Sequence, residues 1–176
     1  MTSDAEVCMF SLGLSVGQLE AAGKSVGADV PYCIEGGTAL AEGIGEILTR
    51  LPLLRGVDIV ILKPGIGVST PWVYKNLKLD KIAWRPETDC LIAAIREKDT
   101  RYIAQNMVNV LETVTIPQYP VVDTAKKRLV ELGASGSMMS GSGPSVFGIF
   151  TDRDKAAYAA QKLADPRWEC FLTQTI

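Results

Sequence analysis

Apolar positions change their spacing along the chain, and each change predicts a different kind of element. Residues 57–62 form a nearly continuous apolar run rich in β-branched side chains, which is typical of a buried strand. Three later segments share this short-strand character: residues 136–140, 145–150 and 168–173. Four segments show the apolar spacing of helices: residues 87–97, 100–114, 123–132 and 154–163.

The resulting order is strand, several helices, strand, strand, helix, strand. This is a split βαβ or ferredoxin-like arrangement with additional helices in its first crossover. We therefore expect an α+β fold, with residues 57–176 forming one domain and residues 51–56 acting as a linker. Within the first crossover, Thr70 is suited to be an N-cap and Pro71 to follow it, which predicts a short helix over residues 72–77.

Residues 1–50 have a different pattern, and we expect them to be the remnant of a separate β-rich domain. Ser15 and Gln18 have capping-box spacing, which predicts a short helix that ends at the following glycines. Pro31 disfavours helical conformation in the residue before it, so a new element is expected there. In residues 32–48 glycines interrupt the apolar positions, which predicts strands joined by a tight turn or bulge.

Composition and charge narrow the classes of function. The chain has 176 residues, 47% of them hydrophobic, and a formal net charge of -2, so it can bury a core. It has no basic stripe of the kind that nucleic-acid binding requires. No apolar stretch approaches the roughly 20 residues that span a bilayer. The acidic N-terminus does not resemble a secretory signal, so we expect a cytoplasmic protein without a nucleic-acid or membrane partner.

The cysteine and histidine content limits the chemistry further. The four cysteines are far apart in sequence and form no closely spaced pair, which argues against a zinc site or a redox dithiol. We therefore expect no metal site formed by protein ligands. The chain has no histidine, which excludes Ser-His and Cys-His nucleophiles and imidazole bases within it. Proton transfer would fall to a carboxylate or a lysine.

The first candidate site is the glycine-rich turn that joins residues 136–140 to residues 145–150. Its members are Ser140, Gly141, Ser142, Gly143, Pro144 and Ser145. Glycines at alternate positions permit positive φ and a close approach of the backbone to a ligand, so free N–H groups there could bind an anion. An ordinary glycine hairpin explains the same residues equally well.

Two individual side chains are further candidates, each with two interpretations. Asp29, next to Val30 and Pro31, could cap the turn that follows it or act as a general base toward a substrate hydroxyl. Tyr74 could pack against the domain or offer a flat face to a base or sugar. The residues alone do not decide between these interpretations.

Taken in order, four segments resemble a family of small-molecule kinases. They are Gly-Ala-Asp-Val-Pro-Tyr-Cys from Gly27, Gly-Gly-Thr-Ala-Leu-Ala-Glu-Gly-Ile-Gly-Glu from Gly36, Pro-Gly-Ile-Gly-Val-Ser-Thr-Pro-Trp-Val-Tyr from Pro64, and Ser-Gly-Ser-Gly-Pro-Ser-Val-Phe-Gly from Ser140. They resemble the GHMP superfamily and, within it, the kinases that act on 4-diphosphocytidyl-2-C-methyl-D-erythritol. The last segment resembles the third signature of that superfamily.

The resemblance implies ATP-dependent phosphorylation of the 2-hydroxyl of this cytidine-diphosphate-linked methylerythritol, a step of non-mevalonate isoprenoid biosynthesis. ATP and Mg²⁺ would be the cofactors and the methylerythritol compound the small-molecule substrate. Asp29 matches the position of the catalytic aspartate, and Tyr74 that of an aromatic residue that stacks on the cytosine. The substrate and phosphate side would be lined by Thr70, Ser140, Gly141, Ser142 and Gly143.

The family also has an N-terminal region that supplies a catalytic lysine and the loop that holds the ATP phosphates, and we find no counterpart of it here. We therefore expect the chain to be the C-terminal portion of such a kinase, inactive by itself. Strands of residues 1–50 that have lost their sheet partners would favour a homodimer. The alternative is a non-catalytic ferredoxin-like binding or interaction module.

Overall fold

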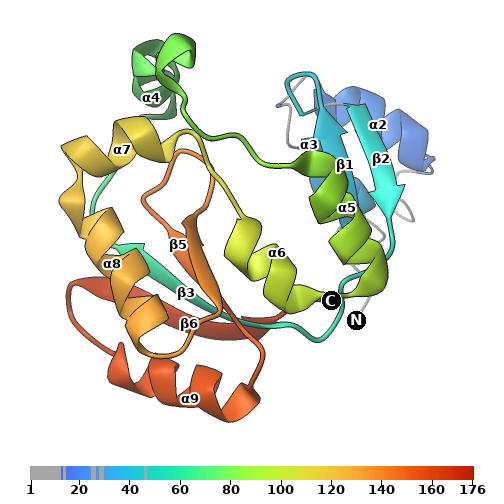
Figure 1. Cartoon of the computed structure of the whole chain (residues 1–176). Helices are drawn as coiled ribbons and strands as arrows, with labels where there is room; N and C mark the ends of the chain where they lie inside the picture. The colour runs from blue at the N-terminus through green and yellow to red at the C-terminus, as the bar shows by residue number, and fades with distance from the viewer. Residues whose placement is uncertain (1–12, 14, 25–26, 28–29, 46) are drawn as a thin grey trace. The chain divides into compact units, whose positions relative to one another are not determined.

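The computed structural model describes residues 13, 15–24, 27, 30–45 and 47–176, and the statements below concern these residues (Figure 1). The chain divides into two compact units, Met1–Leu53 and Leu54–Ile176. In the part of the chain that the structure describes, no helix is both long enough and apolar enough to cross a membrane. Each unit is described separately.

The larger unit is built on a four-stranded antiparallel sheet, with strands in the order β4-β5-β3-β6 (Figure 1). Its strands are β3 (Asp58–Pro64), β4 (Gly136–Met139), β5 (Val146–Phe150) and β6 (Trp168–Gln174). All four agree with the expected segments to within about two residues, and their order is that of a ferredoxin-like sheet. The α+β fold expected from the sequence is confirmed.

Helices pack on both faces of this sheet. On one face lie α8 (Pro120–Glu131) and α9 (Arg153–Lys162), and on the other α5 (Thr88–Glu97) and α6 (Thr100–Asn106) contribute a smaller cluster. The remaining helices of the unit are α4 (Thr70–Asn76), the 3₁₀ turn η1 (Leu79–Lys81) and α7 (Glu112–Gln118).

The main core lies between β3, β5, α8 and α9. Its fully buried side chains include Val60 and Leu62 of β3, Leu129 of α8 and Phe150 of β5. Alternate residues of β3 point into this core, because successive side chains of a strand face opposite sides of the sheet. The second cluster, on the other face, includes Ile149 and the α6 residues Ile103 and Ala104.

Two expectations for the first crossover were wrong in detail. Residues 100–114 are not one helix: α6 ends at Asn106, Met107 is extended with ψ 132°, and α7 begins at Glu112. The N-cap of α4 is Ser69 and not Thr70, because the Ser69 hydroxyl accepts the Trp72 N–H at 3.4 Å. Pro71 is accordingly the second residue of the helix and not the first, still within the first turn.

The smaller unit contains α2 (Val16–Lys24), α3 (Val30–Glu35), β1 (Thr38–Glu42) and β2 (Ile47–Leu51). The capping box is confirmed, since the Ser15 N–H donates to Gln18 Oε1 at 2.9 Å and the Gln18 N–H donates to the Ser15 hydroxyl at 3.4 Å. The expectation of strands throughout residues 32–48 was wrong at its start. Pro31, buried in the first turn of α3, is compatible with the helix there because the N–H that it lacks would have no helical partner.

Candidate functional site

The glycine-rich turn, which we call the glycine loop (residues 140–145), joins β4 to β5 in the larger unit. The Ser140 N–H donates to the Ser145 carbonyl at 2.8 Å, and the Gly143 N–H donates to the Ser140 carbonyl at 2.9 Å. Gly141 and Gly143 have positive φ, +53° and +86°. A Cβ at Gly143 would lie 2.6 Å from Met139 Sδ, so glycine is required there for space as well as for conformation.

Two side chains from outside the loop bind its carbonyl oxygens. Asn109 precedes α7 and donates from Nδ2 to the carbonyls of Met139 at 2.8 Å and Gly141 at 2.7 Å. Thr115 of α7 is fully buried and donates from its hydroxyl to the Ser142 carbonyl at 3.1 Å. Because these carbonyls face the protein, the loop has a defined conformation before any ligand arrives.

A half-buried ion pair braces the strand that leads into the loop. Glu112, at the start of α7, accepts the Met139 N–H at 2.8 Å through Oε1 and binds Lys126 of α8 through Oε2. The two side chains are only 17% and 20% exposed, so water screens them less than a surface pair. Both outward-facing backbone groups of Met139 are therefore held by side chains.

The backbone N–H groups of two loop residues, Gly141 and Ser142, are candidates for binding a ligand. Within the described residues, no hydrogen-bond acceptor is found for the N–H groups of Gly141 and Ser142, although the neighbouring Ser140 and Gly143 N–H groups are bonded. Consecutive N–H groups in a turn conformation form an anion-binding concavity. A cavity of about 420 Å³ borders the loop, lined by Ser140, Ser145 and Val146 and by Ile59, Ile61 and Phe147 of the sheet.

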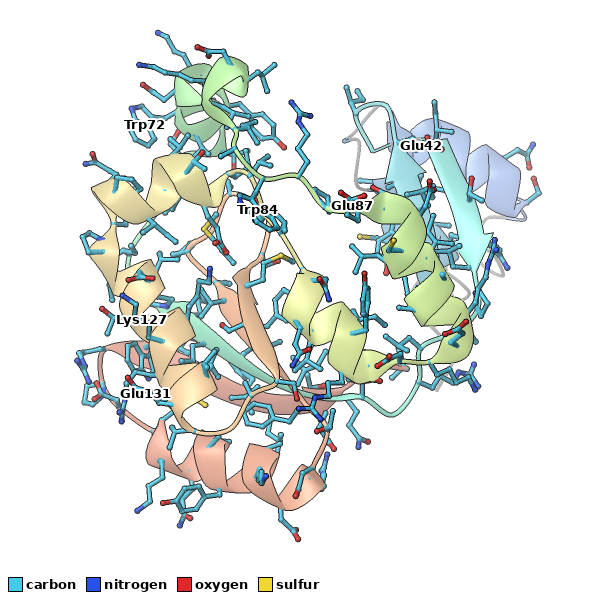
Figure 2. All side chains as sticks on the ribbon, in the orientation of Figure 1. Glu42, Trp72, Trp84, Glu87, Lys127 and Glu131 are labelled. Atoms are coloured by element: carbon cyan, nitrogen blue, oxygen red, sulfur yellow. The ribbon has the colours of Figure 1, made fainter. Side chains whose placement is uncertain are left out.

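The loop is also joined to α4. The Thr70 and Ser142 hydroxyl oxygens lie 2.7 Å apart in a hydrogen bond. Tyr74 lies one turn further along α4 and is 61% exposed, so its ring is not packed in the hydrophobic core. Figure 2 shows two more exposed aromatic side chains, Trp72 on α4 and Trp84 in the segment between η1 and α5. Helix α4 therefore carries an exposed aromatic ring and contacts the polar loop through Thr70.

Six of the seven site residues named from the sequence lie in this region of the larger unit. The structure brings Thr70 and the loop residues Ser140, Gly141, Ser142 and Gly143 together, with Tyr74 on the same helix as Thr70. Asp29 lies outside the described residues, so its role stays a prediction. Among the described residues, no group of three or more His, Cys, Asp or Glu side chains could hold a metal ion.

The sequence reasoning missed the residues that hold the loop. The apolar spacing predicts one continuous helix over residues 100–114, and polar side chains in or beside such a helix are expected to face solvent. This applies to Asn109, Glu112 and Thr115. A signal was available, because asparagine favours positions outside helices, where its side chain can bond to the backbone. Its partners, some 30 residues away in sequence, carried no such signal.

The sequence is similar to those of known kinases. Residues 91–166 match the family described as GHMP kinases C terminal. The chain is similar to the 4-diphosphocytidyl-2-C-methyl-D-erythritol kinase of Acetivibrio thermocellus, with 58% identity over 168 residues, 96% of this chain and 59% of that protein. The corresponding kinase of Clostridium novyi is 45% identical over 96% of this chain and 60% of its own length.

Solved structures of kinases have a similar fold. A crystal structure of 4-(cytidine 5'-diphospho)-2C-methyl-D-erythritol kinase is similar with a TM-score of 0.80 and 28% identity, covering 97% of this chain and 62% of that one. A homoserine kinase from Cytophaga hutchinsonii has a TM-score of 0.70 at 21% identity, over 93% of this chain and 58% of that one, which supports the fold alone. The chain thus spans about 60% of the length of the curated relatives it matches.

Proposed function

We propose that the chain forms the substrate-holding portion of a 4-diphosphocytidyl-2-C-methyl-D-erythritol kinase. Its similarity to such kinases extends over 96% of its length, and residues 91–166 match the family described as GHMP kinases C terminal. The reaction would transfer the γ-phosphoryl group of ATP to the 2-hydroxyl of 4-diphosphocytidyl-2-C-methyl-D-erythritol in non-mevalonate isoprenoid biosynthesis. Within the structure, the observation that best supports this proposal is the Thr70 to Ser142 contact of 2.7 Å. It joins a helix with an exposed aromatic ring to a loop in which two N–H groups have no acceptor among the described residues.

These two parts suit the two ends of the proposed substrate. The ring of Tyr74 would stack on the cytosine, since a base presents a flat apolar face that an exposed aromatic side chain can cover. The N–H groups of Gly141 and Ser142 would bind phosphoryl oxygens. Thr70 and Ser142 would hold the two parts in register, which is the positioning on which phosphoryl transfer depends.

Asp29 would act on the hydroxyl. As the substrate oxygen forms its bond to the γ-phosphorus, the bond from that phosphorus to the β,γ-bridging oxygen breaks, and the hydroxyl proton passes to the Asp29 carboxylate. ATP supplies the phosphoryl group and leaves as ADP. The described residues contain no carboxylate cluster that fits Mg²⁺, so we assign no step to a metal on this chain.

We also propose that the 176 residues assayed alone do not turn over substrate, because the related kinases are longer and the match covers only about 60% of their length. The test protein is therefore a chimera in which the N-terminal region of the Acetivibrio thermocellus relative precedes this chain. ATP-dependent phosphorylation of 4-diphosphocytidyl-2-C-methyl-D-erythritol by the chimera supports the proposal. A folded chimera that binds neither ATP nor cytidine nucleotides would favour a non-catalytic module instead.

Replacing Tyr74 by Ala in the chimera should raise KM for the cytidine substrate about 10- to 100-fold, because stacking of a base on an aromatic ring contributes about 1–3 kcal/mol. The value of kcat should change little, since stacking is equally strong before and during phosphoryl transfer. Steady-state kinetics with varied substrate would measure both constants.

The matched control is Tyr158→Ala, which removes another exposed tyrosine, 53% exposed, on α9. It should leave both constants unchanged. If Tyr74→Ala shifts KM no more than Tyr158→Ala does, the stacking role is wrong and Tyr74 is a surface residue.

We further propose that the chain forms a homodimer through the strands of its smaller unit. A two-stranded sheet is only marginally stable by itself. Within the described residues β1 and β2 form such a sheet, and Ile47 of β2 is 55% exposed. Sedimentation equilibrium should give a dimer for the 176-residue chain and a monomer for Ile47→Lys. Ile176→Lys, which changes a 93% exposed isoleucine in the other unit, is the control and should stay dimeric. A monomeric wild-type chain would contradict this proposal.

A further inference from the structure

The side chain of Asn109 uses all of the hydrogen-bonding groups of its amide in this structure. Its Nδ2 group donates to two carbonyls, those of Met139 and Gly141, at 2.8 and 2.7 Å. Its Oδ1 accepts the Leu111 N–H at 3.0 Å. One carboxamide therefore joins the end of β4, the glycine loop and the start of the segment that leads into α7.

These bonds determine where the loop amides point. In a trans peptide the carbonyl and the next N–H point in opposite directions. Asn109 draws the Gly141 carbonyl toward the protein, so the N–H of Ser142 in the same peptide is directed away from Asn109. The Ser140 carbonyl is held inside the turn by the Gly143 N–H, so the Gly141 N–H is likewise directed away from the interior of the turn.

The alternative orientation of this peptide is accessible when Asn109 is absent. Gly141 has space around it, with no heavy atom within 4 Å of the position where a Cβ would lie, and without a Cβ its ψ, through which this peptide rotates, is little restricted. The peptide between Gly141 and Ser142 can therefore rotate if its carbonyl loses its donor. Thr115 bonds the next carbonyl, that of Ser142, and does not fix this one.

We propose that Asn109 is a positioning residue that orients the peptide between Gly141 and Ser142, so that two consecutive N–H groups face a phosphoryl ligand. The orienting role stands on the geometry alone, whereas the identity of the ligand rests on the proposed function. Asn109 does not touch the reacting atoms and acts through the loop backbone. Glu112 and Lys126 support it by holding the N–H of Met139, whose carbonyl Asn109 binds.

Two variants separate the donor role of Asn109 from its acceptor role. Asn109→Asp keeps an oxygen for the Leu111 N–H but removes both donors, and Asn109→Ala removes all three bonds. If the donors matter, the two variants behave alike. The matched control is Asn106→Ala, which removes an exposed asparagine of α6 whose Nδ2 donates to the Tyr102 carbonyl at 2.8 Å.

The first readout is the set of backbone amide resonances of Gly141, Ser142 and Gly143 in ¹H–¹⁵N NMR spectra of the ligand-free 176-residue chain. Both Asn109 variants should shift the Ser142 resonance while leaving resonances of β3 and α9 in place, which also shows that the domain is folded. Asn106→Ala should shift none of the loop resonances. Unchanged loop resonances in Asn109→Asp would overturn the proposal.

The second readout is a titration of the same proteins with inorganic pyrophosphate. In the wild-type chain the Gly141 and Ser142 amides should respond, and each Asn109 variant should respond about tenfold more weakly, the effect of losing one oriented hydrogen bond. A variant that binds as tightly as wild type would also overturn the proposal. If the wild-type amides do not respond although Asn109 orients them, the positioning role stands and the phosphoryl-binding part of the proposed function fails.

Discussion

Replacing Asp29 by Asn in the chimera should lower kcat about 100- to 10,000-fold, which is the usual contribution of a positioned general base. Asparagine has nearly the same size as aspartate but cannot accept the hydroxyl proton. The KM for the cytidine substrate should change little, because the substrate contacts assigned to Tyr74 and the glycine loop are unaltered. Steady-state phosphoryl transfer from ATP measures both quantities.

The control for this experiment is Asp80→Asn, which neutralises an exposed aspartate in η1. It should retain wild-type kcat. If Asp29→Asn is as active as Asp80→Asn, Asp29 is not the base, and the interpretation of its carboxylate as a cap for the following turn is favoured. The 176-residue chain without the added N-terminal region provides the reference that we expect to be inactive.

The largest effect on stability should come from Phe150→Ala, which we expect to lower the free energy of unfolding by about 3–5 kcal/mol. Phe150 is the last residue of β5, one of the two central strands; it is 1% exposed and packs in the core between the sheet and helices α8 and α9. Alanine would leave a cavity that the surrounding strands cannot fill. Urea unfolding followed by circular dichroism measures the change.

A second phenylalanine of the same sheet provides the control. Phe171 of β6 is 49% exposed, so Phe171→Ala should cost well under half as much as Phe150→Ala. Equal losses for the two variants would mean that the core of the larger unit is not where the structure has it. The comparison holds the residue type, the sheet and the substitution constant.

The strands of the larger unit were predictable because each is specified by the residue pattern of its own short segment. A run such as residues 57–62 is apolar at nearly every position, and no other element explains a short β-branched run as well. The order of the strands along the chain then limited the fold to a ferredoxin-like sheet. The observed order β4-β5-β3-β6 agrees with that inference.

The candidate site was predictable only in part, because the hydrogen bonds that hold it together join residues far apart in the sequence. Thr70 is predicted to be the N-cap of α4, but its neighbour Ser69 caps the helix and Thr70 bonds Ser142 instead. Asn109 was placed inside a helix by the spacing of nearby apolar residues. Its carboxamide instead bonds carbonyls 30 and 32 residues later, a pairing that periodicity cannot detect.

The position of β3 at the centre of the sheet has a consequence for how the protein is made. During synthesis β3 leaves the ribosome first of the four strands, but its two partners, β5 and β6, come from residues after 145. Along its whole length β3 pairs with β6, from Asp58 with Gln174 to Pro64 with Trp168. The nascent chain must therefore carry an apolar β3 without its β6 partner until most of this domain has been translated, a state that invites chaperone binding.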